Sequence, residues 1–272
     1  MSAIRAARAA GLAYREALPG PDSRAHAVLC LHGFPETSLM WTGVLDAAAR
    51  AGYRALAPDL PGSGGSPPAA PNTWEQLVAA VDGFADEVGL PPAILVVHDW
   101  GGLVGLRWAC EHPERVAALV IAGSGFFADG KWHGMASALR AEGTGEEMLA
   151  ALDRGSFGAM MKAVSPRMSE AAIDEYWRSL GTEAGRRAIL EMYRSGDFEK
   201  LAPHEGALGR LGAPTLILWG EDDEFAPLAG AYRFQREIPG AELRVIGGAG
   251  HFLFSDAPEE SVAAVEAFLR EL

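Results

Sequence analysis

The sequence lacks the features that mark secreted or membrane-spanning proteins. It has two cysteines, Cys30 and Cys110, each in an apolar stretch and without the spacing of a metal site. We therefore expect reduced thiols and a cytoplasmic location. No apolar run reaches the roughly 20 residues that a membrane-spanning helix needs. Residues 1–18 also lack the continuous apolar segment of a signal peptide, so we expect no membrane association.

Basic residues are scarce: 23 Lys and Arg stand against 36 Asp and Glu, for a net charge of −13. This surplus of negative charge disfavours nucleic acid as a partner. The spacing of His, Cys and acidic residues indicates no metal site, and no phosphate-binding glycine loop followed by Lys is present. The sequence therefore predicts no metal and leaves the oligomeric state open.

With 272 residues, 49% of them hydrophobic, the chain can form one large domain with a sizeable core. Short β-rich runs alternate with helical stretches, which is typical of a mostly parallel sheet covered by helices on both faces. Parallel strands are predicted at 27–31, 54–57, 94–98, 117–122, 215–219 and 242–246, and two antiparallel edge strands at 4–10 and 12–16. Helices are predicted at 39–51, 74–88, 100–111, 228–237 and 259–272.

One long segment, 126–206, breaks this alternation. It has no convincing strand, and Gly, Pro and Ser separate its helical patterns. Connections of this length in a compact domain usually carry a functional insertion. We predict a helical cap at 126–206, inserted into a core domain of 1–125 and 207–272. Its predicted helices cover 132–141, 146–154, 157–164, 169–180 and 183–195.

The most informative feature is a carboxylate at a strand-to-helix turn. The apolar run 93–98 ends abruptly at Asp99, and a helix of small residues begins at Trp100. A carboxylate is already an anion at neutral pH, so it can attack a saturated carbon and form an ester with the enzyme. This chemistry points to substrates with a carbon–oxygen or carbon–halogen bond. Asp is also a favoured helix N-cap, so the rest of the chain decides between the two readings.

Two further polar segments follow predicted strands, at the edge where open α/β sheets bind ligands. His251 lies in the glycine-rich loop 247–250 after the last strand and is the candidate base. Four consecutive acidic residues at 221–224 follow another strand, and Asp223 is the candidate that orients His251, with Asp222 as the alternative. The order nucleophile, acid, histidine matches that of α/β-hydrolases.

A third such segment is His32-Gly33-Phe34-Pro35. The backbone N–H groups of Phe34 and Trp100 are candidates to hold a developing oxyanion. His32 is predicted to be a structural hydrogen-bonding residue. His98 adjoins Asp99, but adjacent side chains of a strand point to opposite faces. The remaining histidines are predicted to lie on the surface or in the cap: His26, His112, His133 and His204.

Together these motifs resemble the α/β-hydrolase superfamily over nearly the whole chain, in particular its branch with an aspartate nucleophile. The motifs that carry this resemblance lie at residues 32–36, 59–66, 98–102, 220–223 and 250–252. The branch contains epoxide hydrolases and haloalkane dehalogenases. The resemblance implies that Asp99 forms an ester with a small apolar substrate and that His251, held by Asp223, activates water to hydrolyse it. It also implies that the N–H groups of Phe34 and Trp100 stabilise the tetrahedral intermediate, that the cap excludes water, and that no cofactor is needed.

Two features favour epoxide hydrolysis within this branch. Phe34 fits the pattern His-Gly-Phe-Pro, and Tyr193 lies where these enzymes place one of two cap tyrosines that protonate the epoxide oxygen. The other tyrosine has no counterpart, because no tyrosine occurs between Tyr53 and Tyr176. Tyr176 is predicted to be a structural residue of the cap.

Haloalkane dehalogenation is the alternative. It is favoured by Val96-Val97 before His98-Asp99-Trp100, and the indole N–H of Trp100 is a candidate halide donor. The second donor is missing, because position 34 is Phe rather than Asn, and Trp132 and Trp177 do not fall at the expected place. A non-catalytic ligand-binding protein on a hydrolase scaffold is the remaining alternative, because fold does not fix function.

Overall fold

A computed structural model describes residues 4–21 and 23–272; residues 1–3 and 22 of the predicted core domain lie outside the described residues. The described residues form one eight-stranded sheet of order β1-β2-β4-β3-β5-β6-β7-β8. The strands are β1 (Arg5–Ala9), β2 (Leu12–Ala17), β3 (Ala27–Leu31), β4 (Arg54–Pro58), β5 (Ala93–His98), β6 (Val116–Ala122), β7 (Thr215–Gly220) and β8 (Glu242–Ile246).

The sheet is parallel from β4 to β8, and the pairings of β1 with β2 and of β2 with β4 are antiparallel. Every residue of β3, β5 and β7 is buried. Parallel strands covered on both faces read as continuous apolar runs, which is why these strands stand out in the sequence. The predicted fold class, an α/β-hydrolase fold with a mostly parallel eight-stranded sheet, is confirmed.

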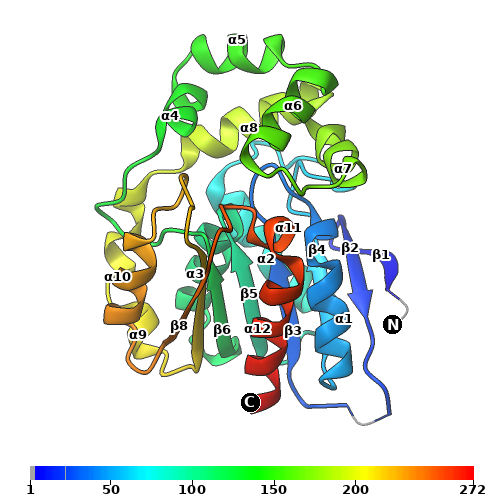
Figure 1. Cartoon of the computed structure of the whole chain (residues 1–272), viewed down its shortest axis with the longest axis vertical. Coiled ribbons are helices and arrows are strands. Elements are labelled where there is room, and N and C mark those ends of the chain that lie inside the picture. The colour runs from blue at the N-terminus through cyan, green and yellow to red at the C-terminus, as the bar shows by residue number, and fades with distance from the viewer. Residues whose placement is uncertain (1–3, 22) are drawn as a thin grey trace.

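Helices cover both faces of the sheet and enclose two core layers (Figure 1). Val28 and Cys30 of β3 pack toward α1 (Thr42–Arg50) and α12 (Pro258–Glu271). Leu29 and Leu31 pack toward the layer that contains α2 (Trp74–Glu87), α3 (Trp100–Glu111) and α10 (Ala229–Glu237). Successive side chains of a strand point to opposite faces, so one strand feeds both layers.

Helix boundaries differ from the predictions where a side chain caps the backbone. The predicted helix 39–51 begins instead as the 3₁₀ turn η1 (Ser38–Trp41), which leads into α1. The predicted helix 146–154 was wrong at its end: α5 (Thr144–Ala151) stops earlier, and Arg154 belongs to α6 (Arg154–Val164). The Asp153 carboxylate accepts a hydrogen bond from the N–H of Ser156 and so starts the new helix.

Five helices lie between β6 and β7: α4 (Gly134–Arg140), α5, α6, α7 (Glu170–Leu180) and α8 (Glu183–Ser195). No strand interrupts them among the residues the structure describes. They form a separate layer beyond one end of the sheet (Figure 1). The 3₁₀ helix η3 (Phe198–His204) and α9 (Ala207–Arg210) return the chain to the sheet. Two further short elements are η2 (Pro113–Arg115) and α11 (Leu253–Asp256).

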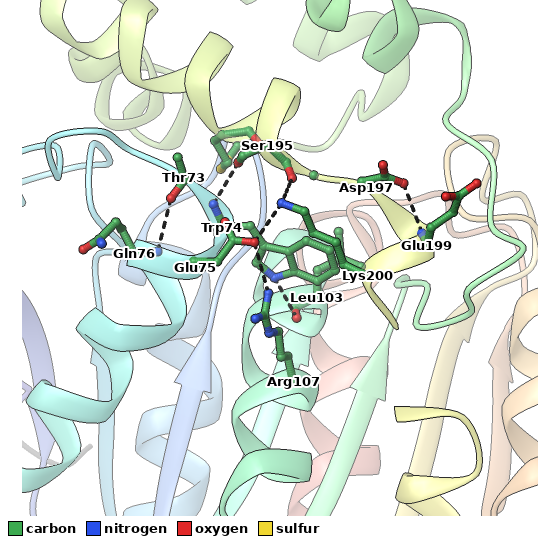
Figure 2. Close-up of polar contacts among 12 residues, drawn as sticks. Thr73, Trp74, Glu75, Gln76, Leu103, Arg107, Ser195, Asp197, Glu199 and Lys200 are labelled. Carbon is green, nitrogen blue, oxygen red and sulfur yellow. Dashed lines mark hydrogen bonds and ion pairs between the residues drawn. The ribbon is translucent and has the colours of Figure 1, made fainter. Parts of the chain in front are cut away.

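Figure 2 shows where the end of α8 is fastened to the start of α2. Ser195 accepts a hydrogen bond from the backbone N–H of Trp74 at 2.8 Å. Lys200 donates to the Glu75 carboxylate at 2.7 Å and to the Ser195 carbonyl at 2.8 Å. The Trp74 indole, in turn, donates to the Leu103 carbonyl of α3 and packs edge-to-face on Trp100. These contacts tie the helical layer to the two helices that flank β5.

The two cysteines are unpaired. Burial raises the pKa of the Cys30 thiol far above its usual range and raises that of Cys110 to about 12. Neither thiol is therefore ionised at neutral pH, which excludes both as nucleophiles. In the described part of the chain, no helix is long and apolar enough to cross a membrane.

Candidate active site

Asp99 occupies a strained turn between β5 and α3. Its φ of 48° and ψ of −121° lie in a region that residues with a Cβ rarely adopt. The turn is possible because α3 packs closely beneath it: a Cβ on Gly101 would lie 2.0 Å from the Leu31 carbonyl oxygen. The strain lifts the Asp99 side chain, 23% exposed, above the carboxyl end of the sheet.

The carboxylate of Asp99 is held from one side by the turn after β3. Phe34 donates its backbone N–H to Asp99 Oδ1 at 2.8 Å. A Cβ on Gly33 would lie 2.3 Å from Asp99 Cβ, so only glycine permits this approach. The first N–H groups of α3, which begin at Trp100, have no partner within their own helix. The structure thus brings the predicted oxyanion donor of Phe34 directly against Asp99.

His251 faces Asp99 and is oriented by Asp223. Its Nε2 lies 3.6 Å from Asp99 Oδ2, and its Nδ1 lies 2.9 Å from Asp223 Oδ2. Asp223 Oδ1 also accepts hydrogen bonds from the N–H groups of Phe225 and Ala226. The structure therefore places Asp223, and not the exposed Asp222, against the imidazole.

The charges of this cluster stabilise one another. Burial opposes ionisation of Asp99, but the hydrogen bond and attraction from His251 lower the pKa of the carboxyl to about 2. Burial also opposes protonation of His251, but hydrogen bonds to Asp223 and Asp99 raise its pKa to about 10. At neutral pH the site therefore holds an imidazolium between two carboxylates.

His98 packs against the His251 ring and makes polar contacts on both sides of its own ring. Its Nδ1 lies 2.7 Å from Oε2 of the buried Glu36, and its Nε2 lies 3.0 Å from the His251 carbonyl oxygen. Two oxygens thus face the two ring nitrogens, and these contacts hold the ring between Glu36 and the backbone of His251. The prediction that His98 points away from Asp99 was incomplete, because the ring supports the backbone of His251 instead.

An aromatic cluster closes the site from above. The Tyr193 ring packs edge-to-face on Phe34 and Trp100, and Trp100 stacks on Trp132 at 5.4 Å. The buried Trp100 Nε1 has no hydrogen-bond partner of good geometry among the described residues. The Trp132 indole, by contrast, donates to the Gly196 carbonyl at 3.2 Å. Of these two indoles, that of Trp132 is the one with a hydrogen-bond partner of good geometry among the described residues.

Tyr193 stays protonated at any ordinary pH. Burial, and then the charge of Asp99, raise the pKa of its hydroxyl well above the usual range, against a smaller lowering by the Trp100 indole. Tyr176 is buried among Glu36, Glu175 and Arg15, and Trp177 packs on Phe157. Of the two buried tyrosines of the helical layer, Tyr193 is the one whose ionisation the charge of Asp99 affects.

Two cavities meet at Asp99. One, of about 280 Å³, extends toward α10 and η3, and the other, of about 40 Å³, lies under α4, α6 and α8. His133 and Phe225 line both. His133 was predicted as a surface or cap residue, and no sequence signal separated it from the other histidines. In the structure it caps α4, with Nδ1 accepting from the Ala136 N–H.

Among the described residues, no group of three His, Cys, Asp or Glu side chains has the arrangement of a metal site. The acidic and histidine side chains near Asp99 are instead paired with one another. The site thus offers a carboxylate, an oriented imidazole and N–H or O–H donors.

Comparison with known proteins identifies the class to which this fold and site belong. The family model for the alpha/beta hydrolase fold matches residues 26–258, and the chain belongs to this family. With its named enzyme relatives, this match identifies the protein as a hydrolase-family enzyme.

The relatives carry several activities, and epoxide hydrolysis and haloalkane dehalogenation are among them. The chain is 29% identical over 292 residues to epoxide hydrolase A of Mycobacterium tuberculosis, covering 90% of each chain. It is 34% identical over 248 residues to a haloalkane dehalogenase of Mycobacterium marinum, covering 86% of this chain and 81% of the relative. The crystal structure of haloalkane dehalogenase DbeA from Bradyrhizobium elkani shares the fold, with a TM-score of 0.82 at 22% identity over 100% of this chain and 98% of that one.

Proposed function

We propose that the protein is an epoxide hydrolase that works through an ester on Asp99. The observation that carries this proposal is the position of Tyr193: the residue lines the same small cavity as Asp99 and His251. Opening an epoxide requires an anion on one side of the carbon and a proton donor near the departing oxygen. The similarity to an epoxide hydrolase supports the same assignment.

In the first step, a carboxylate oxygen of Asp99 attacks a ring carbon, and the bond between that carbon and the epoxide oxygen breaks. The electron pair goes to the epoxide oxygen, which receives a hydrogen bond and then a proton from the Tyr193 hydroxyl. General acid help of this kind typically contributes ~10²–10⁴-fold. Formation of the ester neutralises Asp99 and so removes one of the groups that raise the pKa of His251.

Before the second step, the proton of His251 passes to the Tyr193 phenolate and restores its hydroxyl, so the neutral imidazole becomes the base that deprotonates a water molecule. The resulting hydroxide attacks the carbonyl carbon of the ester on Asp99. The N–H groups of Phe34 and Trp100 hold the oxyanion of the tetrahedral intermediate. On collapse the bond between the carbonyl carbon and the alcohol oxygen breaks, and this oxygen takes the proton of the Asp99 carboxyl group, which releases the diol and restores the carboxylate. Asp223 stabilises the imidazolium that the proton from water leaves on His251.

We propose that residues 126–206 act as a cap over this chemistry. Met135 of α4, Met161 of α6 and Tyr193 of α8 line the small cavity together with Asp99. A cap of this kind excludes bulk water from the ester until His251 delivers one molecule. The attachment of Ser195 and Lys200 to the start of α2 would hold the cap in register (Figure 2).

Haloalkane dehalogenation is the second candidate, and one observation favours it. The unpartnered indole N–H of Trp100 is a ready halide donor, and a haloalkane dehalogenase is among the relatives. A second indole donor is lacking, because the Trp132 N–H is bonded to the Gly196 carbonyl. The epoxide proposal assigns a role to Tyr193 and needs no second indole donor, which is why we prefer it.

The deciding experiment is an assay of the purified protein on phenyl-substituted and aliphatic epoxides beside bromoalkanes of matched size. Diol and released bromide are quantified separately, with Asp99→Ala as the inactive control. We expect diol at a rate well above that of bromide. Bromide release without diol formation would replace the proposal by the dehalogenase alternative.

A further inference from the structure

The two cavities that meet at Asp99 differ sevenfold in volume, at about 280 Å³ and 40 Å³. For scale, a buried apolar cavity of about 150 Å³ accommodates benzene, whereas one water molecule occupies about 30 Å³. The larger cavity thus has room for a substituted aromatic ring. The smaller one has room for little more than a methyl group.

The walls of the two cavities also differ in chemistry. The rings of Phe127, Trp132 and Phe198 line the large cavity, and glycines such as Gly125 and Gly230 leave its other walls flat. Planar rings pack well against aromatic faces and edges. Met135, Met160, Met161 and Val164 line the small cavity, which suits a short aliphatic group.

Phe225 and His133 stand between the two spaces, because both residues line both cavities. The Phe225 ring lies 5.3 Å from the His251 ring and 5.1 Å from that of His133. Asp99 lines both cavities as well. A substrate carbon above Asp99 must therefore send one substituent to each side.

Resting on the proposed function, we propose that the substrate is an unsymmetrical epoxide with one aryl arm and one arm no larger than methyl. The aryl arm occupies the large cavity beside Phe127 and Phe198. The short arm lies among the methionines, on the same side as Tyr193. Size sets the specificity, because apolar side chains line most of both cavities, and the small cavity adds the aliphatic Met and Val side chains to its aromatic walls.

Three epoxides test this proposal: those of 1-phenylpropene, of 1,2-diphenylethene and of 2-butene. We expect kcat/KM for the phenyl–methyl epoxide to exceed both others by at least about tenfold, since single methylenes in apolar pockets change rates by ~10–200-fold. Both phenyl compounds have benzylic carbons, so their difference reports the small cavity rather than intrinsic reactivity.

Two variants assign the arms to their cavities. Met135→Ala widens the small cavity and should raise the rate on the diphenyl epoxide about tenfold relative to the phenyl–methyl epoxide. Met148→Ala, in a half-buried methionine outside both cavities, should leave the ratio unchanged. Gly125→Leu should slow the phenyl–methyl epoxide and spare the dimethyl one. A Cβ on Gly125 meets only Phe198 Cε1 at 4.0 Å among the described atoms, so the backbone tolerates the change.

The outcomes separate this proposal from the one on which it rests. Equal conversion of the three epoxides, or a Met148→Ala effect as large as that of Met135→Ala, would overturn the size assignment and leave epoxide hydrolysis standing. Absence of diol from every epoxide would overturn both. A preference for phenyl–methyl that Met135→Ala weakens against the diphenyl epoxide, and that Gly125→Leu weakens against the dimethyl epoxide, would support both.

Discussion

His251 and Asp99 face each other with Nε2 3.6 Å from Oδ2, while the opposite nitrogen of the same ring lies 2.9 Å from Asp223. The imidazole therefore lies between Asp99, the proposed nucleophile, and the carboxylate that orients the ring. The separation of 3.6 Å is longer than a good hydrogen bond. In the proposed mechanism this gap is the place where the attacking water approaches the ester.

The charged cluster makes stability depend on pH in a specific direction. The pKa of His251 rises from 6.5 to about 10 on folding, so its contribution is fully present below pH 6.5 and is lost as the pH rises through 10. We expect the melting temperature of the parent protein to fall more between pH 7 and 10 than that of His251→Gln. Parallel curves from thermal unfolding at several pH values would contradict this assignment.

The buried Glu36–His98 pair should be sensitive to the loss of one partner. Glu36→Ala leaves His98 without its carboxylate in a fully buried place, which typically costs ~3–5 kcal/mol of unfolding free energy. Glu36→Gln keeps an acceptor and should cost only about 1 kcal/mol. Urea unfolding measures both. Equal losses for the two variants would show that His98 does not depend on the acceptor oxygen at position 36.

The contacts that join the end of α8 to α2 include one backbone hydrogen bond and one surface ion pair (Figure 2). Two variants measure their contributions to stability separately. Ser195→Ala removes the acceptor of the Trp74 N–H and should lower stability by about 1 kcal/mol. Lys200→Met removes the half-exposed pair with Glu75 and should change stability by less than about 0.5 kcal/mol. A larger loss for Lys200→Met in the same denaturation series would refute this ranking.

The strands and most helices were predictable from the sequence because their causes are local. The run 93–98 reads as a buried strand, and α3 occupies the predicted residues 100–111. The start of a new helix at Asp153 was missed because the helical pattern of the sequence continues through this position. A single capping side chain, that of Asp153, starts the new helix there.

The site was predictable only where motifs mark it. The structure brings Asp99, His251, Asp223 and Phe34 together as the sequence motifs suggest, though their catalytic roles remain proposals. Glu36, His133 and Gly196 gave no local signal, because their importance arises from contacts between distant segments. A Cβ on Gly196, for example, would lie 2.6 Å from the Trp100 ring, a constraint that exists only after α8 has packed on α3.

Tyr193 and Trp100 should act on different leaving groups. Tyr193→Phe keeps the ring that packs on Phe34 but removes the O–H, so ester formation from an epoxide should slow by ~10²-fold or more while bromide displacement changes little. Trp100→Phe should affect bromide release most. Single-turnover kinetics measure each step, and Tyr176→Phe, in the buried tyrosine away from the cavities, is the control. Unchanged epoxide opening by Tyr193→Phe would remove its assigned role.

The most direct test of the whole account is to trap the ester. In His251→Gln the first step can proceed but no base activates water, so the ester should accumulate after mixing with the phenyl–methyl epoxide. Intact-protein mass spectrometry should then show one added substrate mass, and peptide mapping should place it on Asp99. An adduct on another residue, or turnover by Asp99→Ala at the parent rate, would contradict the assignment of Asp99 as the nucleophile.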